Sequence, residues 1–145
     1  MTLDLRLLND RVAVAPQIEP ADVPAIAAAG YVAIVNNRPD DEEPGQPAGD
    51  AIRDAAEAAG LAYHAVPVGR AGLGRAELDG MTAALAGADG PVLAYCRSGT
   101  RSCNLWALAA AMAGRDPGLI AAQAEAAGYD LSALRPTLDA LATRS

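Results

Sequence analysis

Twelve residues carry most of the structural information in this sequence: Pro91-Val92-Leu93-Ala94-Tyr95-Cys96-Arg97-Ser98-Gly99-Thr100-Arg101-Ser102. Residues 91–95 form an unbroken apolar run, which is typical of a strand that is covered on both faces. The residues from Arg101 to Ala113 are rich in Ala and precede Gly114, so we expect a helix that ends there. A buried strand that runs directly into a helix is the repeating unit of a parallel α/β sheet.

Upstream of this unit, predicted helices and strands alternate. We expect strands at residues 31–35 and 61–68, and helices at residues 20–29, 50–59 and 76–88. Two short apolar runs around Asn9-Asp10 indicate a hairpin, and two further helices are expected at residues 119–127 and 131–143. We therefore predict a single α/β domain over residues 1–145, with three layers, α/β/α, around a central, mostly parallel sheet.

The composition narrows the class of protein. The chain has 145 residues, 52% of them hydrophobic, and a formal net charge of −7 from 18 acidic and 11 basic residues. These values exclude an acidic disordered chain, and the lack of basic runs argues against nucleic acid as a partner. No segment reaches the ~18 apolar residues of a membrane span. Residues 1–10 lack the pattern of a signal peptide, so we expect a cytoplasmic protein.

The cysteines and the histidine are few. Cys96 and Cys103 lie seven positions apart, and His64 is the single histidine. This set is too small for a disulfide framework or a typical zinc site, so we expect no metal and no cofactor. In a reducing compartment, either cysteine is a candidate catalytic residue. Cys103 is expected to pack in the core, with a reversible disulfide to Cys96 as the alternative.

The connection after the strand at residues 91–95 has the features of an anion site. A tight strand-to-helix loop points backbone N–H groups at an anion, and the positive end of the helix adds to the attraction. Because Cys96 stands first in this loop, we expect its thiolate to be stabilised. Gly99 permits a positive φ or a close backbone approach, and Arg101 offers a planar fork to an oxyanion. Ser102 is expected to cap the helix or to bond the thiolate. The sequence therefore predicts Cys96, Arg101 and Ser102 as catalytic residues, and Arg97, Ser98, Gly99 and Thr100 as an anion-binding set.

Other strand ends meet the same edge of a parallel sheet, where ligand sites form. Arg38 follows one of them, as a second anion contact or as a pairing partner for the acidic residues beyond it. The acidic run at residues 40–43 is either a solvated loop or a source of an acid or base, for which Asp40 and Asp41 are the candidates. The glycine-rich connection at residues 69–74 contains no acid.

Two resemblances follow from these motifs. Residues 95–102 resemble the active-site loop of rhodanese-type sulfurtransferases. Most of residues 4–113 resemble a bacterial protein-tyrosine-phosphatase-like family, which is labelled both as a beta-lactamase hydrolase-like protein phosphatase-like domain and as a sulfur transferase. The matching segments are Ala15-Pro16-Gln17-Ile18, Val35-Asn36-Asn37-Arg38-Pro39-Asp40, Glu42-Glu43-Pro44-Gly45-Gln46-Pro47 and Pro91-Val92-Leu93-Ala94-Tyr95-Cys96.

The family resemblance implies the fold of the cysteine phosphatases, of the phosphotyrosine protein phosphatase II-like type. Relatives fused to metallo-beta-lactamase-like domains imply a persulfide dioxygenase of that class as a partner. Compared with the phosphatases of this fold, two features of the sequence favour sulfur transfer over phosphate chemistry. Four residues separate Cys96 from Arg101, one fewer than in tyrosine phosphatases, so Ser102 stands at the phosphatase Arg position. The connection at residues 69–74 also lacks the acid that phosphatases use to protonate the leaving group.

We therefore predict a sulfurtransferase in which Cys96 takes sulfur from a sulfane donor, such as thiosulfate or a persulfide, and becomes a persulfide. The upstream segments typical of rhodaneses are missing, which keeps a cysteine-dependent phosphatase acting on a phosphate ester as the alternative. A non-catalytic anion-binding module is the third possibility. In each case the substrate or ligand is a small anion. Despite the net charge of −7, Arg97 and Arg101 predict a positive local field at Cys96.

Overall fold

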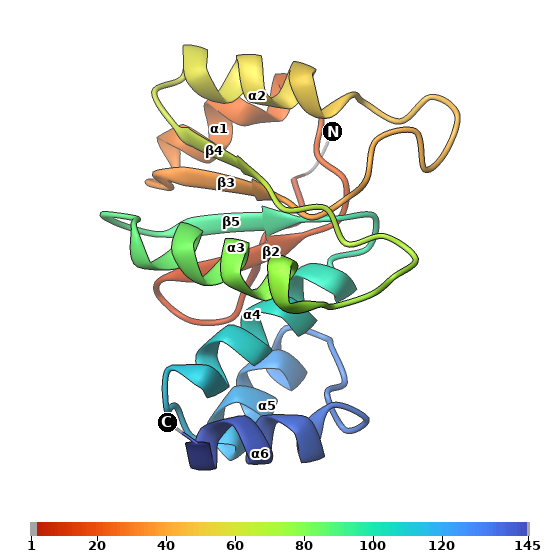
Figure 1. The fold of residues 1–145 in the computed structure, drawn as a ribbon. Coiled ribbons are helices and arrows are strands. Elements are labelled where there is room, and N and C mark those ends of the chain that lie inside the picture. Colours follow the sequence, from red (N-terminus) through yellow and green to blue (C-terminus); the bar gives the residue numbers. More distant parts are fainter. Residues whose placement is uncertain (1–2, 145) are drawn as a thin grey trace.

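The computed structural model describes residues 3–144, so the predicted single domain extends at both ends to residues that lie outside the description. Its centre is a 5-stranded sheet in the order β1-β2-β5-β3-β4 (Figure 1). The β2, β5, β3 and β4 strands are parallel, and β1 pairs antiparallel with β2 at one edge. The strands are β1 Arg6–Leu7, β2 Val12–Ala15, β3 Ala33–Asn36, β4 Ala62–Ala65 and β5 Val92–Tyr95. This confirms the predicted hairpin and the mostly parallel sheet.

Helices cover both faces of the sheet, as Figure 1 shows. On one face lie α1 and α2, and on the other lie α3 and α4, with α5 and α6 packed beyond α4. The bounds are Pro20–Asp22 for the 3₁₀ helix η1, then α1 Val23–Ala28, α2 Gly49–Ala58, α3 Arg75–Ala86, α4 Thr100–Met112, α5 Pro117–Ala126 and α6 Arg135–Arg144. The predicted three-layer α/β/α fold is therefore confirmed.

The β5 strand shows why the apolar runs produce this architecture. Successive side chains of a strand point to opposite faces. Accordingly, Val92 and Ala94 join the core beneath α3 and α4, whereas Leu93 and Tyr95 join the core beneath α1 and α2. All four are buried, as expected for a strand covered on both faces. Alanines at the buried face of α4 allow that helix to approach the sheet closely, and Trp106 fills the space beside them.

Two elements are shorter than their sequence patterns suggest. The expected strand at residues 61–68 is regular only from Ala62 to Ala65, because β4 is an edge strand with one neighbour and Pro67 has no N–H to donate. Val66 and Val68, on either side of Pro67, still donate backbone hydrogen bonds to Asn36 at the end of β3 and to Asn37 directly after it. The expected helix at residues 131–143 begins at Arg135, with Pro136 in its first turn.

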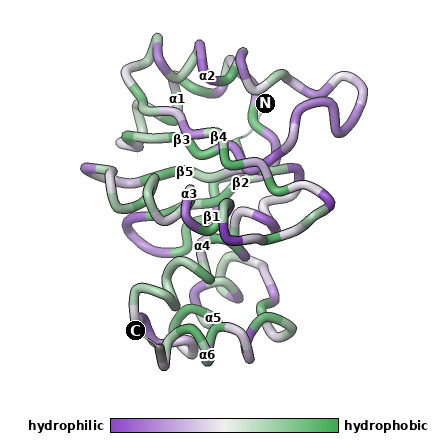
Figure 2. Tube along the Cα trace, in the orientation of Figure 1, coloured by the Kyte–Doolittle hydropathy of each residue, from purple (hydrophilic) through white to green (hydrophobic). Residues whose placement is uncertain are grey.

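The parallel strands all end at one edge of the sheet, and the connections after them lie side by side there (Figure 1). The connection between β5 and α4 is short, whereas the one between β3 and α2 is long and mostly hydrophilic (Figure 2). Within residues 3–144, no helix has the length and apolar character needed to cross a membrane.

Candidate active site

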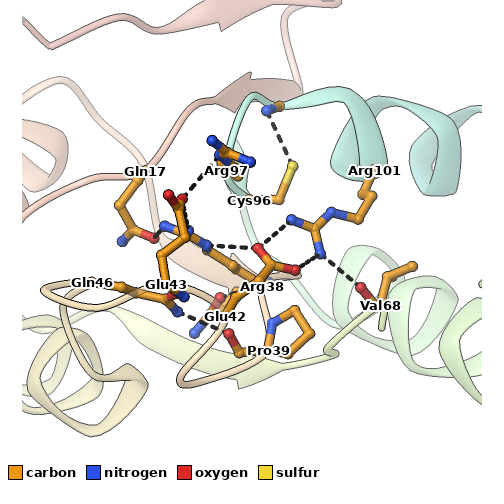
Figure 3. Close-up of polar contacts among 12 residues, drawn as sticks. Gln17, Arg38, Pro39, Glu42, Glu43, Gln46, Val68, Cys96, Arg97 and Arg101 are labelled. Atoms are coloured by element: carbon orange, nitrogen blue, oxygen red, sulfur yellow. Dashed lines mark hydrogen bonds and ion pairs between the residues drawn. The ribbon is translucent and has the colours of Figure 1, made fainter. Parts of the chain in front are cut away.

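Cys96 lies at the base of the β5–α4 loop, directly after the last residue of β5. It is 0% exposed, and its Sγ accepts a hydrogen bond from the backbone N–H of Gly99 at 3.1 Å (Figure 3). Gly99 has a φ of 92°, a left-handed conformation that other residues rarely adopt, and α4 begins at the next residue. The predicted backbone donor to the thiol and the special role of Gly99 are both present.

Ser98 and Thr100 are exposed, whereas Ser102 is buried. Ser98 Oγ lies 3.0 Å from Thr100 Oγ1 and accepts from the Thr100 N–H at 3.4 Å, so these two residues support the start of α4. The Ser102 side chain instead is buried, and its Oγ has no hydrogen-bond partner within the described residues. The expectation that Ser102 caps the helix or bonds the thiolate is therefore wrong: Ser102 lies inside α4, and its hydroxyl makes no hydrogen bond to either group.

Cys103 lies one turn into α4 and belongs to the core, as predicted. Burial, together with the nearby Cys96, raises the pKa of its thiol to about 12. At neutral pH this cysteine is therefore a neutral thiol and a poor nucleophile. Cys96 and Cys103 are both free cysteines.

Arg101 projects from the first turn of α4 toward the long β3–α2 loop. Its Nη1 and Nη2 donate to the two carboxylate oxygens of Glu42 at 2.7 and 2.8 Å, and Nη1 also donates to the Val68 carbonyl at 2.8 Å (Figure 3). The hydrogen bond with Glu42 raises the pKa of Arg101, and the neighbouring Cys96 adds to this effect. Arg101 is thus a fixed cation beside the thiol, in a bidentate geometry that a lysine cannot reproduce.

Arg38 is the buried cation of the site, with 5% of its side chain exposed. Its Nε donates to Glu42 at 2.9 Å, its Nη2 to Glu43 at 2.7 Å and its Nη1 to Gln17 at 3.0 Å. Every nitrogen of the guanidinium has a protein partner. Of the two roles left open by the sequence, the structure therefore gives Arg38 that of pairing partner for the acidic loop.

Glu42 and Glu43 change the charge of the site. Glu43 pairs with Arg97 at 3.0 Å as well as with Arg38, and Glu42 joins Arg38 to Arg101. Hydrogen bonds from Arg101, and to a lesser extent from Arg38, lower the pKa of Glu42 from 4.5 to about 2. The positive local field predicted from the arginines is reduced but not reversed, because these two carboxylates offset two of the three arginine charges.

Asp40 and Asp41, the acid or base candidates, have other positions. Asp40 Oδ1 accepts from the Gly49 N–H at 2.8 Å and so supports the start of α2. Asp41 is exposed and has a φ of 60°. Sequence reasoning also missed Gln17, the Val68 carbonyl and Tyr129, whose hydroxyl donates to the Ser98 carbonyl at 3.1 Å. No local motif marks these three contacts.

Known proteins match this chain over most of its length. A family model described as "Beta-lactamase hydrolase-like protein, phosphatase-like domain" matches residues 4–113. A beta-lactamase hydrolase-like protein from Agrobacterium fabrum is 41% identical over 108 residues, which are 74% of this chain and 25% of that protein. The chain thus spans about a quarter of the length of that relative.

Two solved structures extend the comparison to the fold. A protein from Neisseria meningitidis, described as a "putative phosphatase", is 34% identical with a TM-score of 0.82, over 97% of this chain and 99% of that one. A variant of TpbA from P. aeruginosa in complex with pTyr is 16% identical with a TM-score of 0.66, over 98% of this chain and 90% of that one. At this low identity, the second likeness shows a shared fold only.

Proposed function

The chain belongs to the family of beta-lactamase hydrolase-like protein phosphatase-like domains, and on this premise we propose that it is a cysteine-dependent phosphatase. In this proposal Cys96 is the nucleophile and the substrate is a small phosphate ester. The protein from Neisseria meningitidis that is described as a "putative phosphatase", and that is 34% identical over nearly the whole chain, supports phosphate over sulfane chemistry. TpbA, which has the same fold and is known in complex with pTyr, supports an anionic substrate.

One observation carries the proposal: the nucleophile and its anion-stabilising groups come from one short loop and the first turn of the helix that follows it. The Gly99 N–H lies 3.1 Å from Cys96 Sγ, and the Arg101 guanidinium is close enough to interact with the same sulfur. Preorganised donors of this kind stabilise both the thiolate and the charge that develops on the transferred group.

The reaction balances without a cofactor. The Cys96 thiolate attacks phosphorus, an S–P bond forms, and the P–O bond to the leaving alcohol breaks, with the electron pair going to the leaving oxygen. Water then attacks the phosphocysteine, the S–P bond breaks, and inorganic phosphate leaves as the thiolate is restored. Arg101, whose Nη1 and Nη2 are held by Glu42, stabilises the phosphoryl charge in both steps as a fixed cation beside the thiol.

Protonation of the leaving oxygen is where this site differs from an ordinary phosphatase. Glu42 is ionised at neutral pH because its pKa is about 2, and it is already bonded to two arginines, so it has no proton to give. We therefore expect a preference for aryl phosphates, whose leaving groups are stable as anions, over alkyl phosphates.

Sulfur transfer is the second candidate, and it is favoured by the lack of a proton on Glu42. A sulfane donor needs no acid: the Cys96 thiolate attacks the outer sulfur of thiosulfate, an S–S bond forms, and sulfite leaves with the electron pair of the broken S–S bond. The resulting persulfide passes its sulfur to a thiophilic acceptor. The short spacing of Cys96 and Arg101 suits this smaller anion. A metallo-beta-lactamase-like persulfide dioxygenase as partner, and a cytoplasmic location, belong to this proposal.

Parallel assays separate the candidates. Hydrolysis of p-nitrophenyl phosphate and thiosulfate:cyanide transfer are measured for the wild type and for Cys96→Ser, with Cys103→Ala as the matched cysteine control. We expect phosphatase turnover that is lost in Cys96→Ser and kept in Cys103→Ala. Transfer without hydrolysis, lost in the same variant, would establish the second candidate instead. If neither activity is found while phosphate or thiosulfate still binds, the protein is an anion-binding module.

A further inference from the structure

The peptide group between Ser98 and Gly99 is held from both sides. Its N–H belongs to Gly99 and donates to Cys96 Sγ at 3.1 Å. Its carbonyl belongs to Ser98 and accepts from the Tyr129 hydroxyl at 3.1 Å. A hydrogen bond to the carbonyl of a peptide polarises that peptide and strengthens its N–H as a donor. Tyr129 is thus connected to the thiol through one planar group.

Tyr129 itself is firmly held. It follows Gly128, which ends α5 with a φ of 97°, and its backbone N–H donates to the Ala124 carbonyl at 2.9 Å. The residue is 8% exposed, and the Arg6 guanidinium from β1 lies 5.3 Å from the centre of its ring. Burial raises the pKa of Tyr129 above its ordinary value, so the hydroxyl keeps its proton and remains a donor at neutral pH.

Gly99 completes the arrangement. A side chain at position 99 would overlap the Tyr129 hydroxyl oxygen, so glycine is needed here for space as well as for its positive φ. The close approach indicates that the Tyr129 hydroxyl and the loop are fitted to one another, and that this contact is more than incidental packing. Tyr129 lies outside residues 4–113, which the family model matches.

We propose that Tyr129 is a positioning residue for the Cys96 nucleophile: by holding the Ser98 carbonyl, it aims the Gly99 N–H at the thiolate. The inference rests on the proposed function only in taking Cys96 as the nucleophile, and it applies equally to phosphoryl and sulfane substrates. The titratable groups that interact with Cys96 are Arg101 and Cys103 of α4 and Tyr129 itself. Arg101 and Cys103 are unchanged when only Tyr129 is replaced, so a difference between the two proteins reports on the Tyr129 hydroxyl.

The test is a pH titration of the thiolate by its ultraviolet absorbance, measured as the difference from the matching protein that also carries Cys96→Ser. Tyr129→Phe keeps the ring and its contact with Arg6 but removes the donor. We expect the midpoint of the titration to move upward by about 0.5 to 1 pH unit, which is the size of one weakened hydrogen bond. Tyr31→Phe, which alters another partly buried tyrosine away from the loop, should leave the midpoint unchanged.

A second variant guards against a folding defect in the first. Para-aminophenylalanine at position 129 keeps the ring and a weaker N–H donor, so its midpoint should fall between those of the tyrosine and phenylalanine proteins. Thermal unfolding monitors the fold of each variant. A wild-type midpoint in a folded Tyr129→Phe protein, or in the amino variant if the former does not fold, would overturn the proposal. Because the readout is the thiolate and not turnover, failure here is distinct from failure of the proposed phosphatase activity.

Discussion

The β5–α4 loop and the β3–α2 loop meet at the same edge of the sheet, because β3 and β5 are neighbours and Asn36 pairs with Tyr95. The first loop is short and supplies the thiol and Arg97, and the first turn of α4 directly after it supplies Arg101. The second is long and supplies Glu42 and Glu43. One segment therefore brings the thiol and two cations, and the other brings carboxylates that hold those cations in place.

The two loops are also stabilised in different ways. The short loop is fixed locally, by the left-handed Gly99, the start of α4 and the hydrogen bond to Cys96 Sγ. The long loop is fixed by its own buried Arg38, which binds Glu42 and Glu43. Arg97 and Arg101, which are distant in sequence, bind the same two carboxylates. It follows that changes in the short loop should alter chemistry first, whereas changes in the long loop should alter stability and substrate affinity.

The largest effect is expected from replacing Arg101, the cation of the bidentate contact with Glu42. Arg101→Lys keeps the charge but loses the fork that binds both oxygens of Glu42. We expect kcat/KM for p-nitrophenyl phosphate to fall by about 10²-fold, which is typical for the loss of one preorganised oxyanion donor. Steady-state kinetics at neutral pH measures the change.

Arg75→Lys is the matched control, because Arg75 forms an exposed ion pair with Asp79 on α3. This variant should retain wild-type kinetics. If Arg101→Lys also retained them, charge alone would suffice at this position, and the fixed geometry between the two loops would have no catalytic value.

A smaller effect is expected from replacing Glu42, the carboxylate of the same contact. The pKa of Glu42 is lowered from 4.5 to about 2 by Arg101 first and by Arg38 second. A lowered pKa means that the charged form is favoured by folding, so its stabilisation is complete above pH 4.5 and is lost as the pH falls toward 2. Glu42→Gln should lower the free energy of unfolding near neutral pH by about 1–2 kcal/mol, as expected for charged hydrogen bonds that are partly exposed.

Urea unfolding at a series of pH values measures this effect. The difference between the wild type and Glu42→Gln should shrink as the pH approaches the pKa of Glu42, because the wild-type carboxylate then loses its charge. Asp79→Asn, in the exposed pair with Arg75, is the control and should have little effect on stability. A Glu42→Gln difference that stayed constant with pH would show that the stabilisation does not depend on the charge of the carboxylate.

The same contrast explains what could be predicted from the sequence. The proximity of Cys96, Gly99 and Arg101 was predictable because these residues lie close together in sequence at a strand-to-helix connection, where local geometry determines which groups meet. The bond between Glu42 and Arg101 joins residues 59 positions apart, and Tyr129 reaches a carbonyl 31 positions away. Such contacts depend on tertiary packing, which no local pattern encodes.

The prediction for a buried apolar run was more reliable than the prediction for an exposed polar run. The apolar run at residues 91–95 had one physical solution, a strand covered on both faces, and the structure has it. The polar run at residues 40–43 had several, and its members were found in different roles: Asp40 supports α2, Asp41 is exposed, and Glu42 and Glu43 bind arginines. The partial offset of the positive field at Cys96 was not predicted, because the arginines lie in or near the motif whereas the pairing of Glu42 and Glu43 with them depends on the tertiary structure.

The smallest effect is expected at the rim, where Glu43 pairs with Arg97, whose side chain is 65% exposed. An exposed pair of this kind contributes little to stability, but it competes with an incoming anion for the arginine. Glu43→Gln frees Arg97 while Glu42 and Gln17 still hold Arg38. We therefore expect KM for p-nitrophenyl phosphate to fall by about two- to threefold at low ionic strength, and this gain to disappear at high salt because of screening. Glu57→Gln, an equal charge change on the exposed side of α2, should leave KM unchanged. A rise in KM would mean that Glu43 orients Arg97 toward the substrate, in which case the long loop contributes to binding as well as to the support of the short one.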